Sequence, residues 1–321
     1  MNCHVQHEEP ASIGRDESAY NKNEAQKKRV LVIGASSYIG DGFAKYAKGR
    51  LYVDIVDSYE GWKTAPFEEY DTVLMVAGLA HQKWTRKQRR TNKDLYFAIN
   101  RDLAVAVAKK AKAGGIKQFI YLSSMAVYGQ TEGEISADTK PVPRNSDYYG
   151  LSKYQAEEAL ISVFRAKADK PLHCPDSLCI IRPPMVYGPG CPGKFSALVK
   201  VAKTLPFIPN IKNRRSMIYI DNLSELLCIA AEQGVTGILQ PHNKEYVNTA
   251  WLLAEVAKVM GNRRWILPGL GLLVKCAMPF SSAAKTAFGC LYYTMDATQM
   301  PFDDDYQLVS THESVEISAK L

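Results

Sequence analysis

The stretch "KRVLVIGASSYIGDGFAKYA", residues 28–47, indicates the fold class. Its apolar residues at 29–33 predict a short buried strand, the Gly/Ser-rich run after them predicts a turn, and the remainder predicts a helix. A turn of this kind between a first strand and a helix N-terminus can hold a pyrophosphate on its backbone amides and the helix dipole. The motif alone is weak evidence, because an ordinary tight turn has a similar composition.

The rest of the chain extends this pattern. Further apolar runs predict strands at 51–57, 71–78, 117–124 and 178–184, and helices are predicted between them at 100–115 and 152–168. Short apolar strands that alternate with helices imply a parallel sheet covered on both faces. The sequence therefore predicts an α/β fold built on a doubly wound, Rossmann-like parallel sheet.

The pattern loosens after residue 190, where 217–221 and 245–249 are predicted as strands. Residues 1–28 are polar and poor in aliphatics, so we expect a disordered tail. We expect 29–190 to form the doubly wound domain, with 217–250 returning to it. Two further segments are expected to form a smaller, interleaved C-terminal region, 191–216 and 251–321.

Composition limits the classes of function. The chain has 321 residues, is 46% hydrophobic and carries a net charge of +7. Its largest basic clusters, at 85–90 and 212–216, are expected to be solvated surface, which argues against nucleic-acid binding. A mildly basic protein also suits an anionic small substrate.

Cysteine usage and apolar runs bear on compartment and membrane. The seven cysteines form no CxxC pair and no zinc spacing, so we expect reduced thiols, a cytoplasmic location and no metal site. No run of 18 apolar residues occurs. The nearest, 265–280, is broken by Pro268 and Lys275 and is expected to be buried or interfacial rather than a span. The N-terminus lacks the apolar core of a signal peptide.

Tyr149 and Lys153 stand four residues apart in "YYGLSK", residues 148–153. On a helix these positions share one face. A cation beside a phenol lowers a pKa that is normally about 10, so Tyr149 could act as a general base near neutral pH. An exposed helical turn with a chance Tyr/Lys pair is the alternative, and these six residues do not decide between the two.

An acidic residue supports the dinucleotide interpretation of the first turn. An acid roughly 20 residues after the first glycine typically binds the adenosine ribose hydroxyls and selects NAD over NADP. Asp57 lies at the end of the second predicted strand, at roughly this spacing from Gly34, and is our candidate. Asp54 competes for this role but lies in the middle of the strand.

Several motifs in order together resemble the extended short-chain dehydrogenase/reductase family, in particular nucleotide-sugar epimerases of the UDP-glucose 4-epimerase type. The motifs are "VIGASSYIG" (32–40), "VAGLAH" (76–81), Asn100, "YLSSMAVYG" (121–129), "YYGLSK" (148–153), "IRPPMVYGPG" (181–190) and "RSMIYIDNL" (215–223). The resemblance implies that 29–190 is an NAD-binding Rossmann domain and that the C-terminal region binds the substrate.

The resemblance also implies a catalytic triad of Ser124, Tyr149 and Lys153. Tyr149 would be the acid/base, and Lys153 would hold the nicotinamide ribose hydroxyls and tune Tyr149. Ser124 would hydrogen-bond the reacting sugar hydroxyl, although by itself it could be a strand-end cap.

The implied cofactor is NAD, held by Gly34, Ser37, Tyr38, Ile39, Gly40, Asp57, Ala77, Gly78, Asn100, Tyr149 and Lys153. Ser37 stands where the family has its middle glycine, so the approach of the pyrophosphate is expected to differ. Asn100 would steady the backbone on the cofactor side, although alone it could be an ordinary helix N-cap.

The implied substrate is a nucleotide-diphosphate sugar. Arg215 matches an arginine that grips the diphosphate, a role for which its forked guanidinium is suited. Met185 stands where many UDP-galactose epimerases have an asparagine that touches the substrate, which leaves the sugar open. His81 is expected to be a loop or pocket-wall residue, with substrate contact as the alternative. The resemblance further implies a homodimer.

Within the family, the residues after the triad serine separate the reactions. Sugar 4,6-dehydratases need an acid and a base there, where this chain has Met125 and Ala126. The glutamate of the sugar-acid decarboxylases and the Cys/His pair of the reductase–epimerases are also absent. The resemblance therefore implies a 4-epimerase of UDP-hexose or UDP-N-acetylhexosamine in polysaccharide biosynthesis. The alternatives are an NAD(P)-dependent ketoreductase or dehydrogenase and a non-catalytic dinucleotide sensor or scaffold.

Overall fold

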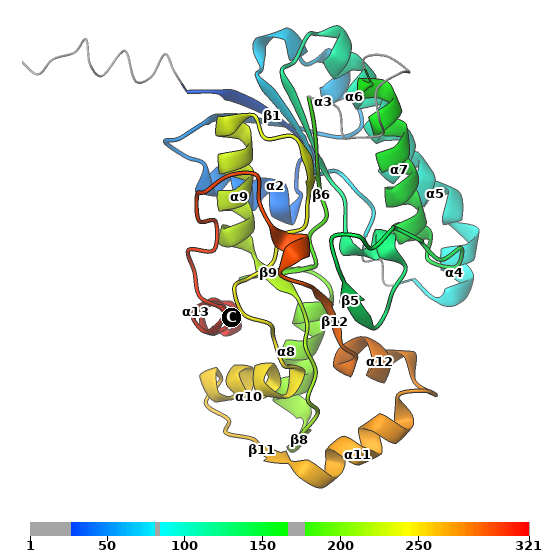
Figure 1. The fold of residues 1–321 in the computed structure, drawn as a ribbon, viewed down its shortest axis with the longest axis vertical. Coiled ribbons are helices and arrows are strands. Elements are labelled where there is room, and N and C mark those ends of the chain that lie inside the picture. The colour runs from blue at the N-terminus through cyan, green and yellow to red at the C-terminus, as the bar shows by residue number, and fades with distance from the viewer. Residues whose placement is uncertain (1–26, 81–83, 166–176, 321) are drawn as a thin grey trace, which may run out of the picture.

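A six-stranded parallel sheet forms the upper part of the protein in Figure 1, a computed structural model that describes residues 27–80, 84–165 and 177–320. Its strands, in order across the sheet, are β2 (Tyr52–Val56), β1 (Arg29–Ile33), β3 (Thr72–Met75), β4 (Gln118–Leu122), β6 (Leu178–Ile181) and β10 (Gly237–Leu239). The chain passes from β1 to β2, its neighbour on one side, and then crosses to β3, its neighbour on the other side. Ligands of such sheets bind at this switch point, beyond the carboxyl ends of the strands.

Helices cover both faces of this sheet. One face packs on α2 (Tyr38–Tyr46) and α9 (Ile220–Gln233), and the other on α6 (Leu103–Ala113) and α7 (Tyr148–Phe164). The residues of β3, β4 and β6 are all buried, which explains why these strands are continuous apolar runs without polar alternation.

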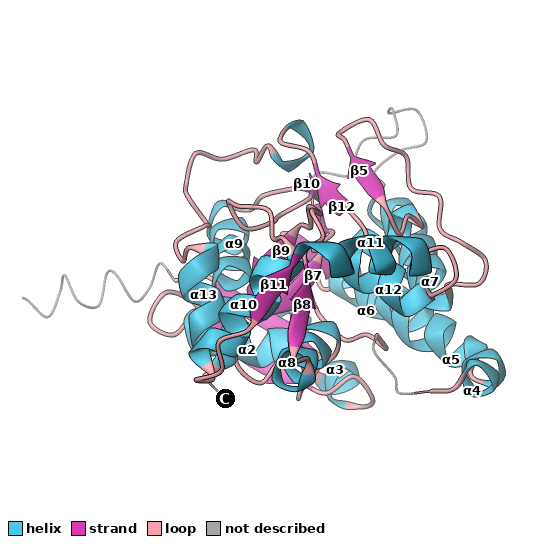
Figure 2. Ribbon diagram, turned by 90° about the horizontal axis from the view of Figure 1, so that it is seen from below, coloured by secondary structure: helices cyan, strands magenta, loops and turns pink. Residues whose placement is uncertain are grey.

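Three two-stranded parallel sheets form the lower part. They are β7 (Met185–Tyr187) with β9 (Met217–Tyr219), β8 (Phe207–Pro209) with β11 (Trp265–Leu267), and β5 (Gly133–Ile135) with β12 (Leu291–Tyr293). The longer helices here are α8 (Lys194–Thr204), α10 (Thr249–Val259), α11 (Pro268–Ala277) and α13 (Thr311–Ala319), and Figure 2 views this end from below.

Short helices complete the fold. They are α3 (Gly61–Thr64), α4 (Arg86–Thr91), α5 (Lys93–Phe97), α12 (Ser282–Phe288), the π segment η2 (Ala98–Asp102), and the 3-10 turns η1 (Phe67–Glu69), η3 (Met125–Tyr128) and η4 (Asp296–Thr298). None of the described helices is both long and apolar enough to cross a membrane.

The predicted fold class, a doubly wound parallel sheet with a smaller interleaved C-terminal region, is confirmed. The interleaving arises because α9 and β10 return to the upper part, where β10 pairs with β6. The predicted tail lies outside the described residues as far as residue 26. Lys28 at its end is anchored, because its carbonyl accepts from Tyr52 N at 3.0 Å and its Nζ donates to the carbonyl of Ala231 at 3.0 Å.

Two local strand predictions were wrong. The run 178–184 is not one strand, because Pro183 and Pro184 cannot donate to a ladder and separate β6 from β7. The segment 245–249 is not a strand, because only Val247 forms an isolated bridge, with Arg215, before α10 begins. Of the two alternatives for the run 265–280, buried or interfacial, burial does not hold, since most residues of α11 are exposed.

Candidate active site

The turn after β1 lies against the ends of both neighbouring strands. Gly34 has φ +130°, a conformation that side chains disfavour, and a Cβ there would come 2.9 Å from Ala77 N. Its own N–H donates to Val56 O at 2.9 Å. The predicted cofactor residues Gly34 and Ala77 therefore meet at the switch point of the sheet.

Helix α2 begins at this turn. Ser37 is its N-cap, and the serine Oγ accepts from Gly40 N at 3.4 Å. The hydroxyl that replaces the family glycine thus satisfies one of the helix's unpaired N–H groups, which stabilises the start of the helix. The side chain of Ile39 packs into the core, whereas the buried hydroxyl of Tyr38 has no hydrogen-bond partner.

Asp57 directly follows β2 and is exposed. Its carboxylate accepts from the backbone N–H groups of Tyr59 at 2.7 Å, Glu60 at 2.9 Å and Gly61 at 3.0 Å. The hydrogen bonds from Glu60 and Tyr59 lower the pKa of Asp57, so it is ionised at neutral pH. A carboxylate has about four acceptor positions, which leaves capacity for a ribose hydroxyl.

The competing acid, Asp54, points to another partner. Tyr70 donates its hydroxyl to Asp54 at 2.9 Å, and Arg29 lies 3.8 Å from the same carboxylate. Asp54 stands opposite Leu31 within the sheet, not at the end of the strands. The structure therefore favours Asp57 for a ligand at the carboxyl edge.

A junction behind the third strand joins three predicted residues. A Cβ on Gly78 would lie 3.1 Å from Lys153 Nζ and 3.2 Å from Asn100 Oδ1. Asn100 Oδ1 accepts from Leu79 N at 2.7 Å, and its Nδ2 donates to Ser152 Oγ at 2.9 Å. Asn100 is therefore not a helix N-cap: it lies inside η2 and ties the loop after β3 to α7.

Helix α7 positions the tyrosine and the lysine. Asp147 caps its first turn by accepting from Gly150 N at 3.2 Å, so the helix begins earlier than predicted and includes Tyr149. Ser124 is the N-cap of η3, where its Oγ accepts from Ala126 N at 3.2 Å. The side chain of Ser124 also hydrogen-bonds that of Tyr149. The structure thus brings Ser124, Tyr149 and Lys153 together.

Burial controls ionisation of the pair. It raises the pKa of Tyr149, and the hydrogen bond with Ser124 opposes this shift. Desolvation lowers the pKa of Lys153 to about 7, although Glu157 acts in the opposite direction. The expectation that Lys153 lowers the pKa of Tyr149 is therefore not met here. The lysine Nζ donates to Leu122 O at 2.8 Å, and its charge at neutral pH is itself incomplete.

A buried ion pair that sequence reasoning missed lies below this site. Arg182 donates to both oxygens of Glu157, at 3.1 and 2.7 Å, and to Tyr128 OH at 2.7 Å. Ser123 also donates to Glu157. The spacing could have revealed Glu157, since it follows Lys153 by four residues and shares its helix face.

Two cations lie toward the predicted substrate side. Arg215 Nη1 donates to the carbonyls of Thr286 at 2.8 Å and Gly289 at 3.0 Å, at the end of α12. Lys194, which sequence reasoning missed, begins α8. Desolvation and repulsion by Arg215 lower the pKa of Lys194, whereas Asp147 raises it. Lys194 therefore links Arg215 electrostatically to Asp147, the N-terminal cap of α7.

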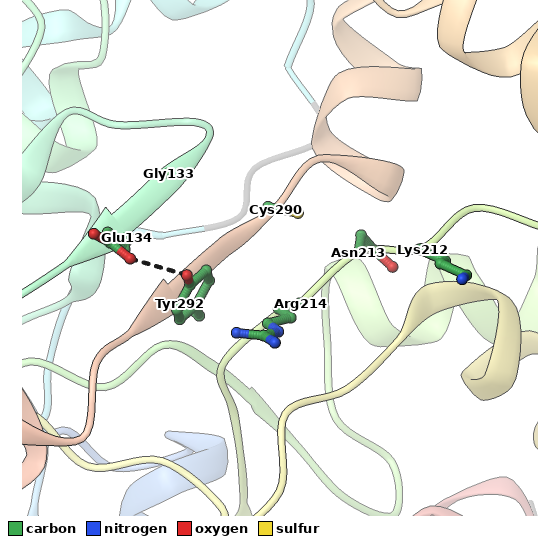
Figure 3. A pocket seen from close by; sticks show the side chains of 7 residues that line it. All are labelled: Gly133, Glu134, Lys212, Asn213, Arg214, Cys290 and Tyr292. Atoms are coloured by element: carbon green, nitrogen blue, oxygen red, sulfur yellow. Dashed lines mark hydrogen bonds between the residues drawn. The ribbon is translucent and has the colours of Figure 1, made fainter.

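A pocket of about 610 Å³ opens beside Arg215. Its lining residues are Gly133, Glu134, Lys212, Asn213, Arg214, Cys290 and Tyr292 (Figure 3). Tyr292 donates to Glu134 at 3.0 Å, and the guanidinium of Arg214 lies 5.9 Å from the Tyr292 ring centroid. The basic cluster 212–216, expected to be plain solvated surface, thus contributes two cations to a pocket. The lining does not include Tyr149.

The other predicted substrate residues are less informative. Met185 is half-buried in β7 opposite Met217 and packs on the core of the lower part. His81 lies outside the described residues.

A metal site was not predicted, yet three potential ligands lie together on α10 and α13. Ligand atoms of Glu255, His312 and Glu316 lie within 4.8 Å of one another. Glu255 is already paired with Lys258 at 2.7 Å. The cluster involves none of the residues around Tyr149.

The arrangement at the carboxyl edge fits a dinucleotide. Gly34 and Gly78 allow the turn after β1 and the loop after β3 to pack closely on Ala77 and Lys153. The start of α2 supplies N–H groups for a pyrophosphate, and Asp57 stands at the end of β2. The other end of this dinucleotide site is formed by Lys153, Tyr149 and Asn100. These are the residues that would hold the cofactor.

Comparisons with known proteins agree with this arrangement. The family model described as "NAD dependent epimerase/dehydratase family" matches residues 15–240, more than half of the chain. The UDP-glucose 4-epimerase of Vibrio cholerae is 32% identical over 182 residues, 54% of this chain and 53% of that protein. The chain thus aligns with about half the length of this relative.

A second relative aligns over a longer span. The N-acetyl-alpha-D-glucosaminyl-diphospho-ditrans,octacis-undecaprenol 4-epimerase of Escherichia coli O157:H7 is 25% identical over 255 residues, 73% of each chain. The solved UDP-N-acetylglucosamine 4-epimerase of Methanobrevibacter ruminantium M1 has a TM-score of 0.66, with 92% and 98% coverage and 16% identity, a likeness of fold. Solved epimerases and reductases both share this fold.

A dinucleotide of the NAD(P) type is the typical cofactor of proteins with this family match, and the motifs found in the sequence are the ones that the match covers. The chain therefore belongs to the NAD dependent epimerase/dehydratase family, the extended short-chain dehydrogenase/reductases, as its motifs predicted.

Proposed function

We propose that the protein is an NAD-dependent 4-epimerase of a nucleotide-diphosphate sugar, a UDP-hexose or a UDP-N-acetylhexosamine. The observation that carries the proposal is the hydrogen bond between Ser124 and Tyr149 with buried Lys153 one helical turn away. Both curated relatives named above are 4-epimerases whose substrates carry a diphosphate. The cations Lys194 and Arg215 suit such a handle. The cysteine pattern supports a cytoplasmic location for the proposed reaction.

In the proposed reaction, Tyr149 takes the proton of the C4 hydroxyl and later returns it to the same oxygen. The hydrogen bond from Ser124 favours the phenolate that the first step needs. The raised pKa of Tyr149 favours the protonated form that the return step needs. Bound NAD would supply the hydride acceptor and donor for C4.

Two absences in the described site favour epimerisation over elimination. Met125 and Ala126, which follow Ser124, cannot exchange protons, so they cannot assist loss of water from C5 and C6. Arg215 and Lys194 would hold the diphosphate while the keto sugar turns. Binding energy from the diphosphate, which does not react, would thereby retain the intermediate.

The test is isotopic. UDP-glucose or UDP-N-acetylglucosamine deuterated at C4 is incubated with the full chain without added cofactor, and the products are resolved by NMR. We expect the C4 epimer with its deuterium retained. Deuterium in free NADH would indicate a dehydrogenase, reduction of a 4-keto nucleotide sugar by added NADPH in a parallel assay a ketoreductase, and binding of NAD without any turnover a sensor. Each of these outcomes would reject the epimerase.

A further inference from the structure

The lower end of the protein exposes large apolar side chains. Helix α11 has a single buried residue, Gly271. Leu272 and Leu273 keep 67% and 65% of their surface exposed, Trp265 in β11 keeps 76%, and Phe280 after the helix keeps 92%. Exposed apolar side chains that gather in this way mark a surface where something else binds.

The same end is strongly basic. No aspartate or glutamate occurs between Ser177 and Ile220 or between Val256 and Met295. These two segments supply β8, β11 and the helices α8, α11 and α12. Their exposed cations near β8, β11 and α11 include Lys200, Lys203, Arg263 and Lys275.

Acidic groups from neighbouring elements do not offset this charge. Glu255 on α10 pairs with Lys258 at 2.7 Å. Glu132 pairs with Lys285 on α12 at 3.1 Å. Among the described residues, Glu255 and Glu132 are the carboxylates that pair with lysines of these two segments. Glu157 pairs with Arg182, which follows β6 in the upper part, so the lower end retains a net positive charge.

The apolar residues are presented on a fixed support. Strand β11 pairs with β8, where Trp265 stands opposite Phe207, itself exposed. Gly271 packs against the backbone of Asn210, which follows β8. The buried side of α11 is thereby held on the protein, and Leu272 and Leu273 remain exposed.

We propose that this face, made of Trp265, Leu272, Leu273 and Phe280 with Arg263 and Lys275, docks on the surface of an anionic lipid bilayer. Apolar side chains flanked by cations bind such surfaces, because the former enter the interface and the latter pair with headgroups. Tryptophan is suited to the boundary between headgroups and chains. A helix of ten residues is about 15 Å long, half of the roughly 30 Å apolar core, so it lies in the surface.

A second copy of the chain fits this face less well. A symmetric contact would bring the same patch of each copy together, and Arg263 and Lys275 would meet their own like charges without acidic partners. An anionic membrane offers both the apolar layer and the opposite charge.

The test is flotation of the full-length protein with vesicles of phosphatidylcholine alone or mixed with phosphatidylglycerol. We expect binding to the anionic vesicles that weakens with salt. Leu272→Ser combined with Leu273→Ser should weaken it at least about tenfold, because two leucines no longer leave water. Arg263→Glu with Lys275→Glu should also weaken it at least about tenfold. Leu308→Ser, at an exposed leucine far along the chain, is the matched control and should bind normally.

Two outcomes would overturn the proposal. One is equal binding of the wild type and both double variants. The other is a wild-type protein that does not bind vesicles but forms an oligomer, and a leucine double variant that no longer forms it. This outcome would assign the face to a second copy of the chain. A Tyr149→Phe protein should dock like the wild type, so failure of docking and failure of the proposed reaction are scored separately.

Discussion

Gly78 and Lys153 approach so closely that a methyl group on the glycine would lie 3.1 Å from the lysine Nζ. The two side chains next to Gly78 are both held by hydrogen bonds. Lys153 Nζ donates to Leu122 O, and Asn100 Oδ1 accepts from Leu79 N. The absence of a side chain at position 78 therefore fixes where the buried ammonium lies relative to Tyr149.

We expect Gly78→Ala to reduce turnover up to about tenfold, because Lys153 Nζ must give by a few tenths of an ångström and a displacement near 1 Å at a reacting group can cost about 10²-fold. The protein should still fold, so melting and turnover are both measured. Gly269→Ala is the control, since a Cβ there meets nothing within 4 Å. A Gly78→Ala enzyme as active as this control would show that Lys153 tolerates movement.

Tyr149→Phe should lower turnover by about 10²–10⁴-fold, the usual contribution of a general acid–base group. NAD binding measured by calorimetry should be largely unchanged, because only the hydroxyl is lost. Tyr148→Phe, at the neighbouring position of the same helix, should remain active. Near-normal activity of the Tyr149 variant would contradict the proposed mechanism.

Asp57→Ala should relax a preference for NAD over NADP. The ionised carboxylate repels a 2′-phosphate and accepts ribose hydroxyls, and the alanine does neither. Binding of the two dinucleotides is compared by calorimetry, with Asp54→Ala as the control. If Asp54→Ala changes the preference and Asp57→Ala does not, the selector has been misassigned.

Glu157→Gln should destabilise the protein by about 3–5 kcal/mol, because it leaves Arg182 as an uncompensated buried charge. Glu60→Gln breaks an exposed pair with Lys63 and should cost about 1 kcal/mol or less. Urea unfolding measures both. Combining Glu157→Leu with Arg182→Met should recover much of the lost stability. Equal losses in Glu157→Gln and Glu60→Gln would refute the distinction between the buried and the exposed ion pair.

Stability should fall as the pH decreases from 6.5 to 4, partly through His242. Its side chain is buried, its Nδ1 has no hydrogen-bond partner, and desolvation lowers its pKa to about 4. The unfolded chain therefore binds this proton below the ordinary pKa of 6.5, whereas the folded protein does not until about 4.

The full effect of His242 is on the order of 3 kcal/mol. His242→Gln should flatten the dependence of the unfolding free energy in this window, measured by urea titrations at several pH values. If the unfolding free energy of the variant depends on pH as steeply as that of the wild type, His242 does not cause the pH dependence.

The sheet and the tyrosine–lysine pair could be predicted because both rest on local periodicity. Buried parallel strands are continuous apolar runs, and a spacing of four places Tyr149 and Lys153 on one helix face. The contact between Ser124 and Tyr149 is not local and was reached through family resemblance. The direction of the Tyr149 pKa was missed because burial, which sequence spacing does not report, outweighs the neighbouring cation.

The remaining differences also come from contacts between distant segments. Lys194 and Arg215 approach each other only because α8 and the segment before β9 fold back together. The apolar composition of α11 was compatible with either a buried or an exposed helix, because composition does not say whether another element covers a helix. Arg182, seen first as part of a motif, proved to be the partner of Glu157.

The pairing of β5 with β12 sets an order of events during translation. Gly133 pairs with Leu291, and Tyr293 packs with Met125 and Tyr128, next to Ser124. A ribosome that adds about 5–20 residues per second needs roughly 8–30 s to make the intervening chain. The segment beside Ser124 therefore remains without this packing until residues 291–293 have been synthesised. A nascent chain that stops before Leu291 would leave Met125 and Tyr128 without their partner, even though all of the triad had already been translated.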